Sequence, residues 1–285
     1  MAKKHISQTE RCHLLERISN SVWTRMVRAH RVKTDLKEIG ITADIISDIL
    51  NFNLDEVANF EVYAKPGWDE DMYGSDMDFF IETSANQYRW FALQAKILKK
   101  NNRYTSLRQT SDGVMQWDKL ALLEAISGCK AYYLLYNGRD SFTATAGTDC
   151  KGTYLGEQYG CSLVEPMEIE RLANIRRGTR YVNPTFEDIH PNHATPWRML
   201  TCCLHSTQNI TLYPKNEILE SDLTFILIDE LQLEDELDVH HEEVNFNQRV
   251  LPPINNNNPI AVASREAGWN PGLRFIINRT DNFIA

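Results

Sequence analysis

Four polar side chains occur in two neighbouring segments that are otherwise strongly apolar. Asp76 and Asp78 precede a polar turn at residues 83–87, and Gln94 and Lys96 follow it. Side chains in a strand alternate between faces, so each pair occupies one face of its strand. If the two strands pair through the turn, two carboxylates, an amide and an amine converge. Oxygen ligands beside a lysine are the groups that a Mg²⁺-assisted attack on a phosphodiester requires.

These groups would have distinct roles in such a reaction. Asp76 is the first choice for a metal ligand. Gln94 could add its side-chain oxygen directly or through water, and the backbone carbonyl of Ala95 is another possible ligand. Lys96 would orient or deprotonate the attacking water, or stabilise the charge at phosphorus. Because a lysine with a pKa of about 10.4 is a poor base at neutral pH, an electrostatic role is the preferred assignment.

The alternative for Asp76 and Lys96 is a structural ion pair across the surface of a sheet. Such a pair contributes under about 1 kcal/mol to stability. Both segments are so apolar that a charged face on them favours a pocket instead.

The pattern resembles that of the PD-(D/E)XK nuclease superfamily, which has the restriction-endonuclease-like fold. Asp76 matches the aspartate of that pattern, and Gln94-Ala95-Lys96 matches the following triplet in a glutamine form similar to that of Mrr-type nucleases. More narrowly, the chain resembles a bacterial family of unknown function within this fold, over roughly residues 40 to 205. That narrower resemblance rests on Gly74-Ser75-Asp76, Gln94-Ala95-Lys96, a helix carrying Gln116, and Tyr136-Asn137-Gly138.

The resemblance implies a function and a cofactor. It implies Mg²⁺-dependent hydrolysis of DNA, with Mn²⁺ as a substitute and products that carry a 5′-phosphate and a 3′-hydroxyl. By association it also implies a prokaryotic antiphage defence effector. Enzymes of this kind often cut two strands as dimers, so a homodimer or higher oligomer is a further expectation. Gln116 is added to Asp76, Asp78, Gln94 and Lys96 as a candidate catalytic residue.

The chain departs from the superfamily pattern at two positions. Ser75 replaces the usual proline, and the neutral Gln94 replaces a charged ligand. Metal binding would therefore depend on further carboxylates. Asp78 is the best placed, Glu61 is a second candidate, and an acidic residue from an early helix is a third. The sequence leaves that third choice open between Asp48 and Glu16.

The predicted elements alternate between helices and strands and indicate an α/β fold. Apolar spacing predicts a helix over 10–31 and a second helix over 43–51, with Thr42 as its N-cap. A strand over 60–64 precedes the two strands of the motif. A helix capped at Ser111 or Asp112 and ending near 127 follows, and then a strand over 131–136. This order favours a mixed central sheet with helices on both faces.

The rest of the chain has weaker patterns. Residues 165–176 predict a helix, 183–196 an ordered loop and 196–206 a short helix, whereas 223–228 and 273–277 predict strands. Residues 251–259, rich in proline and asparagine, predict a flexible connection. We therefore expect a nuclease domain over 1–209 and a C-terminal extension of unknown role over 210–285.

Charge is unevenly distributed along the 285 residues. The net charge is −9, but residues 217–243 hold 11 acidic residues and no lysine or arginine. Residues 83–111 contain no acidic residue, and a local basic patch matters more for phosphate binding than the global sum. Lys99, Lys100, Arg103 and Arg108 are accordingly the candidate DNA-binding residues, although a basic run is also typical of a solvated face.

Composition bounds the remaining possibilities. No apolar run approaches the roughly 20 residues that span a bilayer, and the first eight residues lack a secretory pattern. The six cysteines form no CxxC pair, so we expect reduced thiols in the cytoplasm and no zinc site.

Two other functional classes stay open. The chain could be a catalytically weak module that binds nucleic acid or protein. It could also be a nuclease that is controlled by a nucleotide signal or a partner through residues 210–285.

Overall fold

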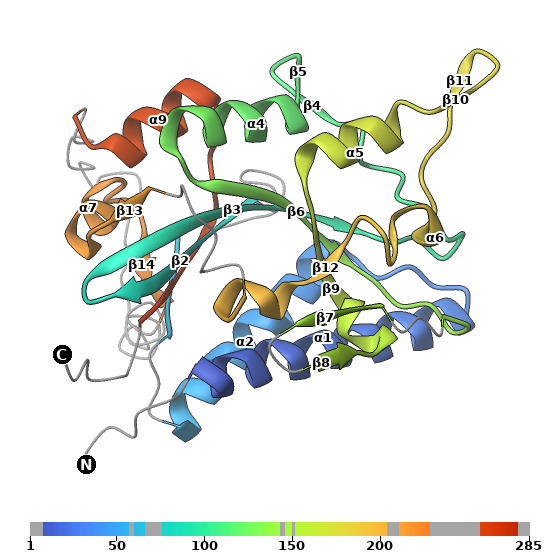
Figure 1. The fold of residues 1–285 in the computed structure, drawn as a ribbon, viewed down its shortest axis with the longest axis horizontal. Coiled ribbons are helices and arrows are strands. Elements are labelled where there is room, and N and C mark those ends of the chain that lie inside the picture. The colour runs from blue at the N-terminus through green and yellow to red at the C-terminus, as the bar shows by residue number, and fades with distance from the viewer. Residues whose placement is uncertain are drawn as a thin grey trace, which may run out of the picture.

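A mixed β-sheet forms the centre of the computed structural model (Figure 1). The structure describes residues 8–56, 60–65, 76–142, 146–149, 152–203, 211–228 and 257–278. Among these, nine strands join one sheet in the order β12-β9-β6-β3-β2-β15-β1-β14, with β13 also paired to β3. The bounds are β1 Phe60–Ala64, β2 Asp76–Ser84, β3 Gln87–Ile97, β6 Lys130–Tyr136, β9 Cys161–Val164, β12 Thr195–Pro196, β13 Leu212–Tyr213, β14 Ile226–Leu227 and β15 Leu273–Ile277.

Helices cover both faces of this sheet (Figure 1). On one face lie α1 (Gln8–Arg31) and α2 (Glu38–Glu56), with the 3₁₀ turns η1 (Gly156–Gly160) and η2 (Trp197–Thr201) packed against α1. On the other face lie α4 (Gln116–Ser127), α5 (Pro166–Ala173) and α9 (Pro259–Ala267). The expectation of a mixed α/β sheet flanked by helices is confirmed. No helix of the described residues is long and apolar enough to cross a membrane.

Short elements complete the described chain. The helices α6 (Phe186–Ile189) and α7 (Lys215–Glu220) are single turns or little more. Three two-stranded hairpins lie outside the central sheet: β4–β5 (Thr110–Ser111 and Val114–Met115), β7–β8 (Ala146–Asp149 and Gly152–Tyr154) and β10–β11 (Arg176–Arg177 and Arg180–Tyr181).

Two predicted helix starts are wrong. Helix α2 begins at Glu38, so Thr42 lies inside it; the Thr42 hydroxyl bonds the Glu38 carbonyl at 3.2 Å and the Tyr136 hydroxyl at 2.9 Å. Tertiary contact thus replaces the capping role. Ser111 and Asp112 belong to the β4–β5 hairpin, where Asp112 has a φ of 55° and Gly113 a φ of 78°. Since these angles are incompatible with a right-handed helix, α4 begins only at Gln116.

Residues beyond 210 form part of the same sheet. Strand β15 lies between β1 and β2, antiparallel to the first and parallel to the second, and all five of its residues are buried. Leu273, Phe275 and their neighbours could not stay in solvent, so this apolar run enters the middle of the sheet. The segment predicted as an extension therefore supplies a central strand. Most of the predicted flexible connection, 251–256, lies outside the described residues.

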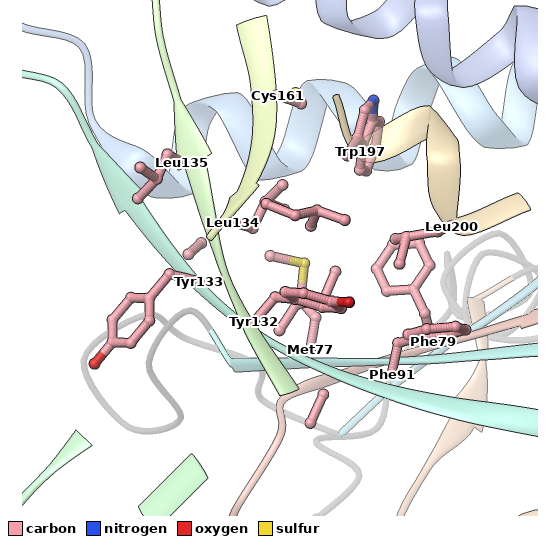
Figure 2. Close-up of a cluster of buried hydrophobic side chains, with 14 of the residues drawn as sticks. Met77, Phe79, Phe91, Tyr132, Tyr133, Leu134, Leu135, Cys161, Trp197 and Leu200 are labelled. Atoms are coloured by element: carbon pink, nitrogen blue, oxygen red, sulfur yellow. The ribbon is translucent and has the colours of Figure 1, made fainter. Parts of the chain in front are cut away.

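One face of the central strands carries an apolar layer. Figure 2 shows Met77, Phe79, Phe91 and Leu134 turned toward Trp197 and Leu200, whereas Tyr133 points to the other side of β6. The rings of Phe79 and Phe275 stack at 4.4 Å between centroids. This layer frees the opposite face of β2 and β3 for polar residues.

Gly160 tests how closely α1 approaches the turn η1. A Cβ atom at Gly160 would lie 1.9 Å from the backbone oxygen of Ser19 in α1. Gly160→Ala must therefore displace the helix backbone, and we expect it to lower the free energy of unfolding by about 1–3 kcal/mol. Gly40→Ala is the control because a Cβ there meets nothing within 4 Å in α2; it should be neutral or stabilise by up to about 1 kcal/mol. Urea unfolding of both variants measures the difference, and equal midpoints would contradict the close approach.

Candidate active site at the end of the β2–β3 hairpin

The pairing of β2 with β3 brings three predicted site residues to one face at one end of the sheet. Asp76 lies directly opposite Gln94 in the antiparallel register, and Lys96 is two residues further along the same face. The two-residue turn at 85–86 that connects the strands has Asn86 in the left-handed region at φ 54°, which asparagine tolerates better than most residues. The predicted pairing of the two strands is confirmed.

Asp76 has the electrostatics of a carboxyl group removed from water. Burial raises the pKa of Asp76 to about 7; the charge of Lys96 and a hydrogen bond from Gln94 oppose that rise, whereas the charges of Asp78 and Glu38 add to it. At neutral pH this carboxyl is thus poised between its two protonation states. A bound cation would favour the carboxylate.

Lys96 is almost fully enclosed, with 3% of its surface exposed. Its ammonium donates a hydrogen bond to Oε1 of Gln109 at 2.8 Å. Burial lowers the pKa of Lys96, and the negative charges of Glu38 and Asp76 partly offset this. The electrostatic role expected for Lys96 from the sequence stays a prediction.

Glu38 is the site carboxylate that the sequence analysis missed. It is the first residue of α2, and its charge acts on both Asp76 and Lys96. The Thr42–Tyr136 hydrogen bond holds the first turn of α2 against the last residue of β6. Glu38, four positions before the predicted cap, could have been considered, since helix N-termini favour acidic residues.

The other predicted carboxylates lie elsewhere. Asp48 is exposed and lines an open hollow between α1 and α2. Glu16 accepts a hydrogen bond from Gln158 at 2.8 Å. Glu61 contacts Lys215 and accepts hydrogen bonds from Tyr63 at 2.7 Å and Asn278 at 2.8 Å.

Strand register also separates Glu61 from Asp76. Glu61 pairs with Ile276, which pairs with Phe80, so it lies two strands across and four residues along from Asp76. Strand geometry then gives roughly 16 Å between their Cα atoms. The structure does not bring Glu61 to the site.

Asp78 has the surroundings of a structural anchor. It is fully buried, and its Oδ1 accepts hydrogen bonds from the indoles of Trp90 at 2.8 Å and Trp269 at 2.9 Å. Its Oδ2 lies 3.7 Å from Nη2 of Arg274 on β15. Burial raises the pKa of Asp78, and Arg274 and the two indoles oppose that rise. The carboxyl thereby ties β2 to β3, to β15 and to the chain after α9.

Some buried polar atoms have no hydrogen-bond partner among the described residues. They include the hydroxyl of Tyr133 and Oε1 of Gln116, and also Oδ2 of Asp78, which faces Arg274. Tyr133 pairs with Gln94 in the parallel register, and burial together with the charge of Asp76 raises the pKa of its hydroxyl. The backbone N–H of Gln116 donates to the backbone carbonyl of Gln109 at 3.2 Å, and the side chain of Gln109 contacts Lys96. Because buried polar groups are normally paired, the Tyr133 and Gln116 atoms are available to a ligand or water.

The site offers a donor set for Mg²⁺ without a dense acidic cluster. No group of three or more His, Cys, Asp or Glu side chains suited to a metal occurs in the part of the chain that the structure describes. Carboxylate oxygens of Asp76 and Glu38, with amide, carbonyl and water oxygens, match the way Mg²⁺ is commonly held.

Comparison with protein families gives a match over most of the chain. The chain matches over residues 11–281 a family described as a family of unknown function, DUF6615. It belongs to the DUF6615 family. No curated protein matches the chain, and no solved structure does.

The predicted DNA-binding cations of this DUF6615 protein are partly engaged with their own chain. Lys100 lies 3.7 Å from Asp35 and donates to the carbonyl of Lys33. Arg103 donates to the carbonyl of Asn183 at 2.6 Å. The Arg108 guanidinium stacks on Tyr181, and Lys99 is half-buried. Their contact with DNA stays a prediction.

The raised pKa of Asp76 predicts a dependence of stability on pH. The folded state holds this proton up to about pH 7, whereas an unfolded aspartate loses it near about pH 4. Between these values the folded chain binds more protons, so stability falls as pH rises. Asp76→Asn lacks this loss. We therefore expect the melting temperature of Asp76→Asn minus that of the unsubstituted chain to increase between about pH 4 and about pH 8, in buffer that contains a metal chelator. Asp112→Asn, at an exposed aspartate, is the control and should show no such rise. A constant difference for Asp76→Asn across that range would contradict its burial.

Asp78 and Asp76 are predicted to respond differently to removal of the carboxyl group. Asp78→Ala leaves two indole N–H groups without their buried acceptor and removes the charge that pairs with the buried Arg274 guanidinium. We expect a loss of about 3–5 kcal/mol in the free energy of unfolding. Asp76→Ala, two residues away on the same face, should be neutral or stabilising at pH 8 because it removes a destabilised charge. Denaturant unfolding compares the two, and similar losses would show that Asp78 is no anchor.

Proposed function

We propose that this protein is a metal-dependent nuclease of the restriction-endonuclease-like fold that hydrolyses phosphodiester bonds of DNA. The observation that carries the proposal is the grouping of Asp76, Gln94 and Lys96 on one face, with Glu38 adding charge from α2. A buried amine beside partly buried carboxyl groups, at the open end of a sheet, is an arrangement suited to binding a phosphate through a cation.

Each of these residues has a defined part in the proposed reaction. Asp76 and Glu38 would hold Mg²⁺, together with an oxygen of Gln94 or the Ala95 carbonyl. The ion, when bound, would polarise the phosphoryl group and lower the pKa of bound water. Gln94 keeps the Asp76 carboxylate oriented through its hydrogen bond. The Lys96 ammonium would stabilise negative charge on a phosphoryl oxygen as water attacks phosphorus and the bond to the 3′ oxygen breaks.

The arrangement of elements supports the proposed fold. An antiparallel β2–β3 hairpin carries the polar groups, and β6 continues the sheet in parallel with β3. A helix on either face begins near the site, α2 with Glu38 and α4 with Gln116. The antiphage role, an oligomeric state and control by a nucleotide signal or partner rest on the resemblance and on sequence reasoning.

A binding or regulatory module on the same fold is the second candidate. The neutral Gln94 and the absence of a group of three acidic or other metal-ligating side chains among the described residues favour it. Calorimetric titration with Mn²⁺ separates the two candidates. A nuclease should bind the ion at a site that Asp76→Ala removes, whereas the module need not.

Nuclease activity is tested with plasmid DNA and Mg²⁺ or Mn²⁺. The purified chain should nick or degrade the plasmid, because Asp76 and Glu38 supply ligands and Lys96 supplies charge. Asp76→Ala, Lys96→Ala and Glu38→Gln should each lower the rate by at least about 100-fold. The measurement is the initial rate of supercoiled plasmid loss on an agarose gel, with a chelator lane as the blank.

The matched controls keep the result interpretable. Asp48→Asn and Glu61→Gln change carboxylates that lie away from the site and should leave the rate within about twofold. Circular dichroism and thermal unfolding establish that each inactive variant is folded. Full activity in Lys96→Ala would refute the proposal. Deletion of residues 210–285 does not test a control role, because it removes the central strand β15.

A further inference from the structure

The β10–β11 hairpin presents a cluster of exposed arginines. We call residues 176–181, Arg-Arg-Gly-Thr-Arg-Tyr, the arginine hairpin; all six are exposed, and residues 174–184 contain no acidic residue. Figure 1 shows the hairpin projecting from the molecule beyond α5. In a chain of net charge −9, a projecting patch of one sign is where a polyanion would be attracted.

The base of the hairpin is ordered by stacking. The guanidinium of Arg108 lies 3.6 Å from the centre of the Tyr181 ring, and that of Arg176 lies 4.4 Å from it. Arg108 also donates to Asn174, and Arg176 to the Tyr181 hydroxyl. Arginines held on an aromatic ring keep N–H groups directed outward, so less side-chain entropy is lost when they bind.

The arginine side chains at the tip of the hairpin make no contact with the rest of the described chain that would prevent them from binding a partner. The side chains of Arg177 and Arg180 have no hydrogen bond or ion pair among the described residues, and Gly178 lies in the turn between these two paired residues with a φ of 65°. A two-stranded β-ribbon is narrow enough to enter the major groove of duplex DNA. Arginine also binds phosphate in a bidentate manner.

Two consecutive residues, Arg108 and Gln109, connect the hairpin to the candidate active site. Arg108 stacks on Tyr181, and the next residue, Gln109, accepts the hydrogen bond of the Lys96 ammonium. A polyanion bound to the hairpin would therefore lie beside the loop in which Gln109 contacts Lys96.

We propose that the arginine hairpin is a nucleic-acid-binding arm that grips the phosphate backbone of duplex DNA next to the active site. The identity of the polyanion rests on the proposed function. An anionic membrane or an acidic protein would also attract arginines. The ribbon shape, the stacked guanidinium groups and the contact with the Lys96 loop favour nucleic acid.

The test compares two pairs of substitutions that remove the same charge. The double substitution Arg177→Gln and Arg180→Gln removes both charges at the tip of the hairpin. The double substitution Arg17→Gln and Arg28→Gln removes two exposed charges of α1, which lies on the opposite face of the sheet. Both pairs are made in the Asp76→Ala chain so that DNA is not cut. Binding to a fluorescent duplex is measured by anisotropy from about 50 to about 200 mM KCl.

The proposal predicts a specific loss. The hairpin pair should bind about tenfold or more weakly, and the slope of log affinity against log salt should fall in magnitude by about 1.8, whereas the α1 pair changes neither by comparable amounts. Equal losses in both pairs would overturn the proposal. So would duplex binding that stays unchanged while binding to phosphatidylserine vesicles is lost.

Failure of this inference is distinguishable from failure of the proposed function. If the unsubstituted chain cleaves plasmid and the hairpin pair binds duplex normally, the function stands and the arm is refuted. If no chain cleaves but the hairpin pair loses duplex binding, the arm stands without the nuclease. Equal melting temperatures for the two pairs establish that neither loss comes from unfolding.

Discussion

The register between β2 and β3 is the constraint on which the rest of the structure depends. Asp76 pairs with Gln94, and this alignment determines the face of the sheet on which every other side chain of the hairpin lies. A slip by one residue would turn Met77 and Phe79 toward the polar side and bury the carboxyl groups in the aromatic layer. The layer that Met77, Phe79 and Phe91 form with Trp197 therefore specifies, indirectly, where the charged groups must be.

The polar face keeps its charges by pairing them within the sheet. Asp78 is balanced by Arg274 and by two indole donors, so its charge serves cohesion among three strands. Asp76 has no comparable set of donors, and burial leaves its pKa near the pH at which proteins work. Two aspartates two residues apart thus differ in what surrounds them, and only the less satisfied one is suited to receive a ligand.

Local sequence patterns predicted much of the sheet but little of its long-range assembly. The strands at Phe60–Ala64 and Leu273–Ile277 were predicted to the residue because each is a short apolar run bounded by polar or turn residues. The position of β15 between β1 and β2 joins segments about two hundred residues apart, and no local pattern encodes that choice. The helix predicted over 165–176 is shorter than expected: α5 stops at Ala173, and Arg176, the expected last residue of that helix, begins a strand.

The site shows the same limit at smaller scale. Periodicity was enough to place Asp76, Gln94 and Lys96 on one face, since all three lie within one hairpin. Glu38 comes from another element, and its approach depends on Thr42 bonding Tyr136 across the end of the sheet. The capping rule selected Thr42 for a local reason, whereas the folded chain uses its hydroxyl for a tertiary one. A residue whose role depends on such a contact is not recoverable from spacing alone.

The loop after β3 has to satisfy two opposite requirements within adjacent residues. Lys96 is enclosed and needs nearby acceptors, one of which is Gln109, whereas Arg108 lies at the surface on the ring of Tyr181. Consecutive Cα atoms are about 3.8 Å apart, so movement of one residue is transmitted to the other. Arg108 thus contacts the Tyr181 ring, one peptide unit joins Arg108 to Gln109, and Gln109 accepts the hydrogen bond of the Lys96 ammonium. In the proposed enzyme, this chain of contacts would join recognition of the backbone to placement of the positive charge at the scissile phosphate.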